Sequence, residues 1–260
     1  SLPDLYPIDG ECLIRNLLRG IRYSDSLGGH LKVAYESFGW GQTAQFPQIY
    51  KGFGLDTVIV GKNVSKERAP ESEFIWEGPD GSKVLATRLG QHARANFFMN
   101  AYIDIMYGKP YLSDEYKYDW GNMGAIYHQA DEVNHHTDYV KLQYTEKMHE
   151  ERIKDAIDLA WKATNDTNVK DHRVLMDGSD STTPQPMITD VIKKANEIYE
   201  DKEFIHSTLE EYTDKLIEVL DFDQLKTVKG ELRDGPACSC SANALATRPE
   251  LKILNKRVQN

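Results

Sequence analysis

The sequence predicts an α/β fold with a mostly parallel sheet. Apolar segments of strand length alternate with longer segments of helical periodicity along most of the chain, and this alternation is the pattern of βαβ units. The segment DTVIV, residues 56–60, is apolar and β-branched, which is typical of a buried parallel strand. Two predicted strands also end in loops that contain glycine and carboxylates, and parallel sheets bind their ligands at the carboxyl ends of strands.

Residues 9–24 predict an amphipathic helix, because apolar residues recur there at helical spacing while Arg15, Arg19 and Arg22 fall on the opposite side. Pro47 suits the first turn of a short helix, where its missing N–H costs nothing. In FIWEGPDGSKVLATRL, a Pro-Asp-Gly turn between two apolar runs indicates a hairpin. The elements expected so far are a helix at 9–24, strands at 31–35 and 56–60, a short helix at 44–52 and a hairpin at 74–89.

The alternation is expected to continue after an irregular, aromatic excursion over residues 95–135. A periodic run of apolar residues predicts one long helix at 138–165. The remaining expected elements are strands at 172–176 and 203–207 and helices at 187–200 and 208–220, the last with Ser207 or Thr208 as its N-cap. Because the alternation stops near residue 226, we expect an α/β domain over residues 1–225 and the start of a helical domain within residues 226–260.

The composition is that of an ordinary soluble protein, with 40% hydrophobic and 28% charged residues. A net charge of −10 argues against nucleic-acid binding, which needs a basic surface. No apolar run approaches the ~20 residues of a membrane helix. Three cysteines do not make a disulfide framework, which favours a reducing compartment such as the cytoplasm. Because the chain has no initiator Met and ends within a helical pattern, we expect it to be part of a longer protein.

Two strand-end loops carry the residues best suited to chemistry. The loop ESFGWGQ follows the strand at 31–35 and starts with Glu36, and the loop DGSDST follows the strand at 172–176 and contains Asp180. Two carboxylates that face each other are the minimum for glycoside hydrolysis, one as the acid and one as the nucleophile or base. The alternative for Asp180 is a plain turn in which it caps the helix predicted at 187–200, and this alternative stays open.

The histidines and cysteines do not define a metal site. The HTD run at 136–138 has the spacing of a strand-end metal pair, but it precedes a predicted helix, where its Thr or Asp is a good N-cap, so a solvated loop explains it better. The CSC run at 238–240 lacks the second pair of a zinc site. There is no Walker, GxGxxG or GxSxG motif, so the sequence does not support a nucleotide-binding protein or a serine hydrolase.

Six segments occur in one order along the chain: GQTAQFPQIYKGFGLD, FIWEGPDGSKVL, HRVLMDGSD, EFIHSTLEEY, GELRDG and ATRPELKILNKRVQN. Together they resemble glycoside hydrolase family 38, the α-mannosidases, in its bacterial branch. The resemblance runs nearly end to end and is weakest over residues 95–140. It implies a seven-stranded parallel β/α barrel-like catalytic domain, here without its N-terminal part, followed by the start of a helical bundle.

The resemblance further implies a retaining hydrolase that acts on α-mannosides, either oligosaccharides or smaller glycosides. Family members bind one divalent ion, usually zinc or another cation such as calcium, which grips vicinal sugar hydroxyls. An aspartate nucleophile also binds the ion, and a second aspartate is the acid/base. By the resemblance, a His-x-Asp pair and a further histidine that complete the metal shell lie before residue 1 and after residue 260. No nucleic-acid or membrane partner is expected, and a homo-oligomer stays open.

Carried over residue by residue, Asp180 in GSD matches the acid/base, whose pKa must be raised for proton donation. The nucleophile position depends on the alignment. Anchored on SFG it falls on Glu36, which would then also bind the metal, and anchored on QTAQFPQ it falls on Phe38, which has no carboxylate. Trp40 in the same loop, and Lys62, where the family often has an arginine, are the candidate substrate contacts.

Three hypotheses follow. The first is the catalytic part of an α-mannosidase-like hydrolase, and the second is a non-catalytic carbohydrate-binding or structural relic that has kept the fold and lost its nucleophile. A third, another carbohydrate-active α/β barrel such as a deacetylase, is disfavoured by the absent metal triad. A carboxylate within about 5–5.5 Å of Asp180, the separation that retaining chemistry needs, distinguishes the first hypothesis from the second.

Overall fold

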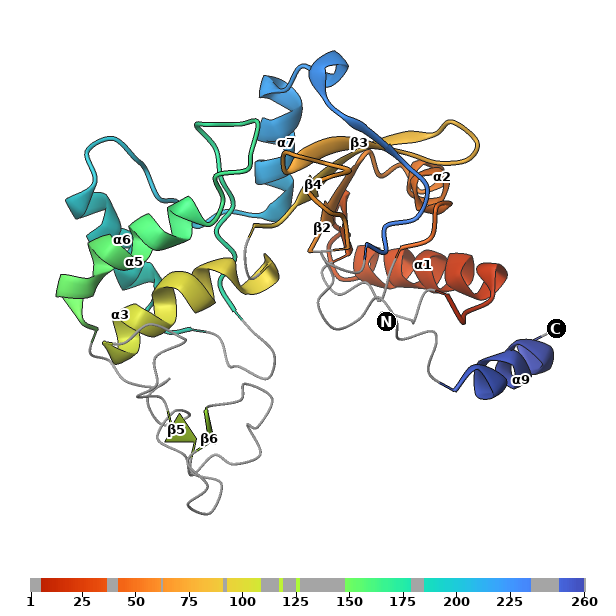
Figure 1. Ribbon diagram of the computed structural model, residues 1–260, viewed down its shortest axis with the longest axis horizontal. Helices are drawn as coiled ribbons and strands as arrows, with labels where there is room; N and C mark the ends of the chain where they lie inside the picture. Colours follow the sequence, from red (N-terminus) through yellow and green to blue (C-terminus); the bar gives the residue numbers. More distant parts are fainter. Residues whose placement is uncertain are drawn as a thin grey trace. The chain divides into compact units, whose positions relative to one another are not determined.

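The computed structural model describes residues 6–36, 42–61, 63–90, 93–108, 117–118, 125–126, 148–178, 185–234 and 248–259. The chain forms two compact units (Figure 1). Unit 1 consists of residues 1–89, 166–172 and 209–260, and unit 2 of residues 90–165 and 173–208. Within the described ranges, no helix is long and apolar enough to cross a membrane.

A five-stranded mixed sheet is the framework of unit 1, with the strand order β1-β2-β4-β3-β7. Its strands are β1 (Val33–Glu36), β2 (Thr57–Val60), β3 (Glu73–Glu77), β4 (Lys83–Arg88) and β7 (Thr227–Lys229). Strands β1, β2 and β4 are parallel, β3 is antiparallel to β4, and β7 is parallel to β3. The α/β class is therefore confirmed. The described part of the sheet does not close, so the seven-stranded parallel barrel is not confirmed.

The β3–β4 hairpin explains why the sheet is mixed. Glu77 pairs with Lys83 across a tight turn, in which Gly81 has a φ of 84° and the carboxylate of Asp80 accepts a hydrogen bond from the N–H of Ser82 at 3.1 Å. Because the chain reverses at this turn, β3 must run against β4. The predicted hairpin is confirmed, and so is the buried parallel strand β2, whose four residues are all buried.

An aromatic core packs helix α2 (Phe46–Gly52) against the sheet. Phe46, Tyr50 and Trp76 are buried, with ring centroids 5.0 to 6.4 Å apart, and Val58 of β2 belongs to the same cluster. Aromatic pairs at such distances stabilise a core beyond the area that they bury. Pro47 lies in the first turn of α2, as the sequence predicts.

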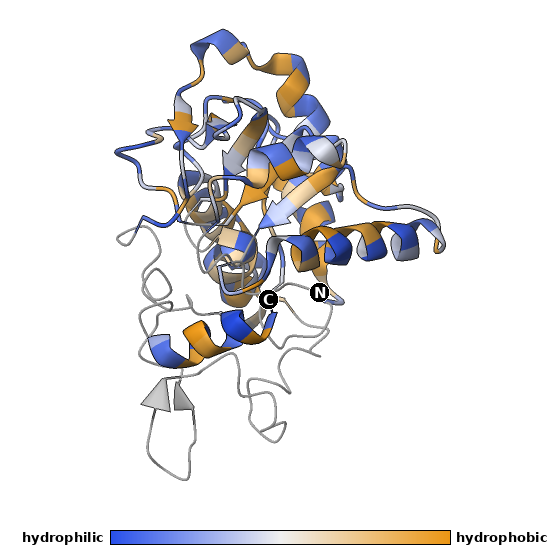
Figure 2. Cartoon of the chain, turned by 90° about the vertical axis from the view of Figure 1, so that its right-hand side faces the viewer, coloured by the Kyte–Doolittle hydropathy of each residue, from blue (hydrophilic) through white to orange (hydrophobic). Residues whose placement is uncertain are grey.

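Unit 1 also contains helices α1 (Gly10–Asp25), α7 (Leu209–Val219) and α9 (Pro249–Gln259) and the short helix η4 (Phe222–Gln224). Asp9 caps α1 by accepting from the N–H of Glu11 at 3.0 Å, and the three arginines on its predicted polar side are exposed. Apolar and polar residues alternate along both α1 and α9 (Figure 2). Residues 209–260 fall in the same unit as the sheet, and the helical domain expected within residues 226–260 stays a prediction.

Unit 2 is largely helical in its described part. It contains η1 (Ala93–Ala95), the π-helix η2 (Phe98–Tyr102), α3 (Ile103–Tyr107), η3 (Glu150–Arg152), α5 (Ile153–Lys162), α6 (Ile188–Ile198) and the two-residue strands β5 (Lys117–Tyr118) and β6 (Ala125–Ile126). Phe98, Ile153 and Val191 lie in one apolar core, so η2, α5 and α6 pack together. Arg152 grips Asp104 of α3 with three hydrogen bonds of 2.8 to 3.0 Å.

Three predicted elements differ from the structure. Residues 172–176 and 203–207 are not strands. Within the range 138–165, for which the sequence predicts one helix, residues 148–149 are not helical and helix begins at residue 150. Residues 138–147 lie outside the described ranges. The helices α6 and α7 confirm the two predictions that surround residues 203–207.

An asparagine side chain takes the place of a neighbouring strand in both failed cases. Asn96 donates to the carbonyl of Val174 at 3.2 Å and accepts from the N–H of Met176 at 2.6 Å. Asn196 does the same for the two backbone groups of Phe204, at 2.8 and 2.7 Å. A side-chain amide offers both a donor and an acceptor, so it can pair one backbone carbonyl and one backbone N–H in the absence of a neighbouring strand.

The buried Arg88 and the partly buried Asp166 form an ion pair next to the loop between β2 and β3. Arg88, which is 8% exposed, donates to the carboxylate of Asp166 at 3.0 Å and to the carbonyls of Val64 and Ala69 at 3.3 and 3.0 Å. Burial would raise the pKa of Asp166, but the hydrogen bond and charge of Arg88 outweigh it and lower that pKa. Lys66 reaches the same carboxylate at 3.3 Å from an exposed position.

The substitution Arg88→Met should lower the free energy of unfolding by about 3–5 kcal/mol, because it leaves the Asp166 carboxylate, which is 13% exposed, without its main donor. Lys66→Met is the matched control, since it removes an exposed lysine from the same carboxylate, and should cost less than about 1 kcal/mol. Urea unfolding followed by circular dichroism measures both variants. Equal losses in the two would contradict a special role for the buried pair.

Candidate active site

The carboxyl ends of β1, β2 and β4 lie side by side at one edge of the sheet. The register places Glu36 opposite Val60, and Val60 opposite Arg88. The N–H of Gly61 donates to the carbonyl of Glu36 at 3.1 Å, so β1 and β2 stay paired to their last residues. Glu36 is thus the final residue of β1, at the edge where parallel sheets bind ligands.

The side chain of Glu36 is held from helix α2. Because side chains alternate along a strand, Glu36 shares the face of Ala34, which packs in the core with Tyr50 and Val60. The hydroxyl of Tyr50 donates to Oε1 of Glu36 at 2.9 Å. Burial raises the pKa of Glu36 to about 7, although the hydrogen bond from Tyr50 acts in the opposite direction. Such a carboxyl is about half protonated at neutral pH, which suits proton transfer better than metal binding.

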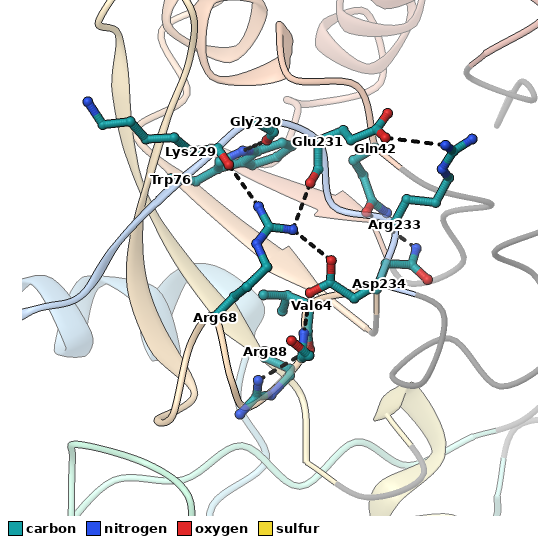
Figure 3. Close-up of polar contacts among 12 residues, drawn as sticks. Gln42, Val64, Arg68, Trp76, Arg88, Lys229, Gly230, Glu231, Arg233 and Asp234 are labelled. Carbon is teal, nitrogen blue, oxygen red and sulfur yellow. Dashed lines mark hydrogen bonds and ion pairs between the residues drawn. The ribbon is translucent and has the colours of Figure 1, made fainter.

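A polar network lies next to the same strand ends (Figure 3). Gln42 and Leu232 exchange two backbone hydrogen bonds of 2.9 Å, and Nδ2 of Asn63 donates to Oε1 of Gln42 at 3.3 Å. Asp234 and Arg68 form an ion pair of 2.7 Å. Gln42 and Asp234 lie in segments that carry the family resemblance, whereas nothing in the sequence pattern singled out Asn63 or Arg68. The network was therefore missed at the sequence level.

Among the predicted site residues, Glu36 lies within the described ranges. Asp180, Trp40 and Lys62 lie outside them, as does Phe38, the other residue that the alignment offered for the nucleophile position. The roles of these residues and their distances from Glu36 stay predictions.

The described residues do not fit the metal ion that the resemblance implies. No group of three or more His, Cys, Asp or Glu side chains in the described ranges is arranged to hold an ion. Glu36 is bonded to a tyrosine, and its raised pKa opposes the ionised form that a metal requires. No catalytic step through a metal follows from these residues.

The raised pKa of Glu36 predicts a pH dependence of stability. The folded pKa of about 7 exceeds the ordinary value of 4.5, so folding favours the protonated carboxyl. The stabilisation is complete below pH 4.5 and is lost as the pH rises to 7. The Glu36→Gln variant stays neutral at every pH. Relative to it, the free energy of unfolding of the native chain should fall by roughly 2–4 kcal/mol across this window. Urea unfolding at a series of pH values measures the difference, and parallel curves would refute it.

The variant Tyr50→Phe tests the effect of the Tyr50 hydroxyl on the pKa of Glu36. Because the Tyr50 hydroxyl lowers the pKa of Glu36, its removal should move that pKa above 7, as read from the carboxyl ¹³C shift in an NMR titration. A downward movement would mean that the hydroxyl does not act on the ionised carboxylate.

Comparison with known proteins shows that this chain is similar to glycoside hydrolases. The family described as glycosyl hydrolases family 38 N-terminal domain matches residues 2–231. A protein of Halalkalibacterium halodurans that carries the name of a mannosylglycerate hydrolase is 27% identical over 272 residues, which cover 99% of this chain and 25% of that protein. Alpha-mannosidase G of Dictyostelium discoideum is 40% identical over 83 residues, which cover 29% of this chain and 7% of that protein.

The fold has a match among solved structures. The crystal structure of an alpha-mannosidase from Enterococcus faecalis matches with a TM-score of 0.67 and 22% identity, over 90% of this chain and 22% of that one. At this identity the likeness shows the fold alone. The chain spans 25% of the length of the Halalkalibacterium protein and 22% of the Enterococcus chain. Because the family match extends over residues 2–231, this chain belongs to glycosyl hydrolase family 38.

Proposed function

We propose that the protein containing this chain is a retaining α-mannosidase-like glycoside hydrolase that acts on α-mannosides with a divalent metal. The observation that carries the proposal is the family match over residues 2–231. The names of the relatives, a mannosylglycerate hydrolase and an alpha-mannosidase, support mannosides as the substrate class, either oligosaccharides or smaller glycosides. The position of Glu36, at the ligand-binding edge of a parallel strand pair, is consistent with it.

The proposed roles follow the two-carboxylate scheme of retaining hydrolases. Asp180 donates a proton to the leaving oxygen, and a second carboxylate attacks the anomeric carbon to form a glycosyl-enzyme that water then hydrolyses. Glu36 is the carboxylate that the described strand ends offer for the second role. Trp40 would stack on the sugar, and Lys62 would contact its hydroxyls.

The remaining parts of the proposal concern the longer protein. We propose that further strands complete a seven-stranded barrel, and that one zinc or calcium ion is held mainly by ligands outside this chain. The described residues do not hold such an ion by themselves. A cytoplasmic location is proposed on the low cysteine content alone.

A second candidate function is a carbohydrate-binding or structural relic that has lost its nucleophile. The observation that favours it is the hydrogen bond from Tyr50, which holds Glu36 on the face of the sheet that α2 covers. A nucleophile must instead be ionised and lie about 5–5.5 Å from the acid/base. A measured separation of the Glu36 and Asp180 carboxyls well beyond this range, with no other carboxylate near Asp180, would decide for the relic.

We expect the isolated 260-residue chain to bind no stoichiometric zinc and to hydrolyse neither an aryl α-mannoside nor mannosylglycerate. The reason is that its described residues do not form a metal site, and the family's other metal ligands are expected outside it. Metal analysis after dialysis and release of the aryl alcohol are the measurements. Robust hydrolysis by this chain would contradict the prediction.

The control for an inactive chain is the longer protein. There we expect hydrolysis, with Asp180→Asn lowering the rate at least about 10²-fold, the usual contribution of a general acid. Glu36→Gln separates the two candidate functions further, because only a nucleophile would lose nearly all activity on this substitution. An active longer protein that Glu36→Gln leaves unchanged would remove Glu36 from the mechanism.

A further inference from the structure

The two residues that flank segment 37–41 are both bonded to the chain that follows β2. Glu36 ends β1 before this segment, and its carbonyl accepts from the N–H of Gly61 at 3.1 Å. Gln42 begins the chain after it, and its Oε1 accepts from Nδ2 of Asn63 at 3.3 Å. Both Gln42 and Asn63 are 0% exposed. Whatever fixes Gly61 and Asn63 therefore also fixes the two residues, Glu36 and Gln42, that flank segment 37–41.

The backbone at Asn63 is in a conformation that needs support. Its φ of 78° lies in the left-handed region, which non-glycine residues occupy at a cost, although asparagine tolerates it better than most. Its carbonyl accepts from the N–H of Asp234 at 3.1 Å, and the carboxylate of Asp234 accepts from the N–H of Ser65 at 2.7 Å. Asp234 therefore holds the turn on both sides of Val64.

Arg68 in turn holds Asp234 in place. Its Nη1 donates to Oδ1 of Asp234 at 2.7 Å and to the carbonyl of Glu231 at 2.9 Å, and its Nη2 donates to the carbonyl of Lys229 at 2.8 Å (Figure 3). The planar guanidinium binds three acceptors through two of its nitrogens, whereas the three donors of a lysine all start from one nitrogen and have no fixed fork. The side chains of Arg68 and Asp234 are 32% and 17% exposed, so the pair is partly shielded from solvent.

Leu232 connects this network back to Gln42. It lies in the chain between Glu231 and Asp234, both of which Arg68 binds. Leu232 and Gln42 exchange two backbone hydrogen bonds of 2.9 Å. The Nε2 of Gln42 has no hydrogen-bond partner in the described part of the chain, so the bond from Asn63 is the contact that orients its amide. Gln42, residues 63–68 and residues 229–234 thus form one connected hydrogen-bond network that the Arg68–Asp234 ion pair holds together.

We propose that Arg68 and Asp234 are positioning residues, which set the placement of Glu36 and Gln42 at the strand ends through Gly61 and Asn63. This inference rests on the proposed function for its catalytic meaning, since it deepens the account of the same site. The alternative is a local structural clasp that affects only residues 229–234 and the adjacent turn. The two differ in whether a change at Asp234 reaches Gln42 and Gly61.

The test is amide hydrogen exchange, measured by NMR on the 260-residue chain and its Asp234→Asn and Arg68→Met variants. We expect exchange at the amides of Gln42 and Gly61 to accelerate about tenfold or more, because a charge-assisted hydrogen bond is lost. The amide of Val58 in the buried strand β2 should keep its native rate. The side-chain amide resonance of Gln42 should shift in both variants, which a purely local clasp would not cause.

Two further variants make the outcome decisive. Arg68→Lys keeps the charge but loses the planar guanidinium. Its exchange rates at Gln42 and Gly61 should therefore lie between those of the native chain and those of Arg68→Met. Glu77→Gln, which removes an ion pair with Lys229 in the same sheet, is the matched control and should change neither amide. Acceleration confined to residues 64–68 and 229–234 would overturn the proposal, and so would equal acceleration at Val58. Exchange does not depend on hydrolysis, so failure of the proposed function would be seen separately.

Discussion

The parallel pairing of β1, β2 and β4 is the constraint on which the rest of unit 1 depends. In register, Glu36, Val60 and Arg88 end three neighbouring strands in one row, so the segments that follow them must leave the sheet at the same edge. Irregular segments at such an edge carry backbone groups that have no ladder partner, and burying them unpaired is costly. The structure resolves this with arginines: Arg88 binds the carbonyls of Val64 and Ala69, and Arg68 binds two carbonyls of the returning chain.

In unit 2 a neutral asparagine side chain, instead of an arginine, pairs backbone groups that have no ladder partner. Asn96 binds the carbonyl of Val174 and the N–H of Met176, where a strand would have provided a neighbour. A guanidinium supplies donors only, so it suits loops whose carbonyls converge, whereas an amide suits an extended segment that needs one donor and one acceptor. The choice of side chain therefore follows from which backbone groups remain unpaired.

Local patterns predicted the elements whose shape depends on local chemistry. Pro47 at the start of α2, the turn before β4 and the apolar run of β2 are examples. The strands at 172–176 and 203–207 failed because an apolar run of that length does not show whether a neighbouring strand exists. For the site, the sequence correctly placed Glu36 at a strand end, but Tyr50 and the Arg68–Asp234 pair depend on contacts between segments that no local pattern reveals.

The position of Glu36 limits what the chain can do more than its pKa does. A pKa of about 7 leaves about half of the carboxyl ionised at neutral pH, which by itself would slow a nucleophile only about twofold. Orientation is the larger effect, because a displacement of about 1 Å can cost roughly a hundredfold in rate. Glu36 shares its face with Ala34 and is bonded to Tyr50 of α2, within the layer between sheet and helix. For Glu36 to attack a sugar, its side chain must exchange the Tyr50 hydroxyl for the substrate, so the strength of that one hydrogen bond bears directly on the choice between hydrolase and relic.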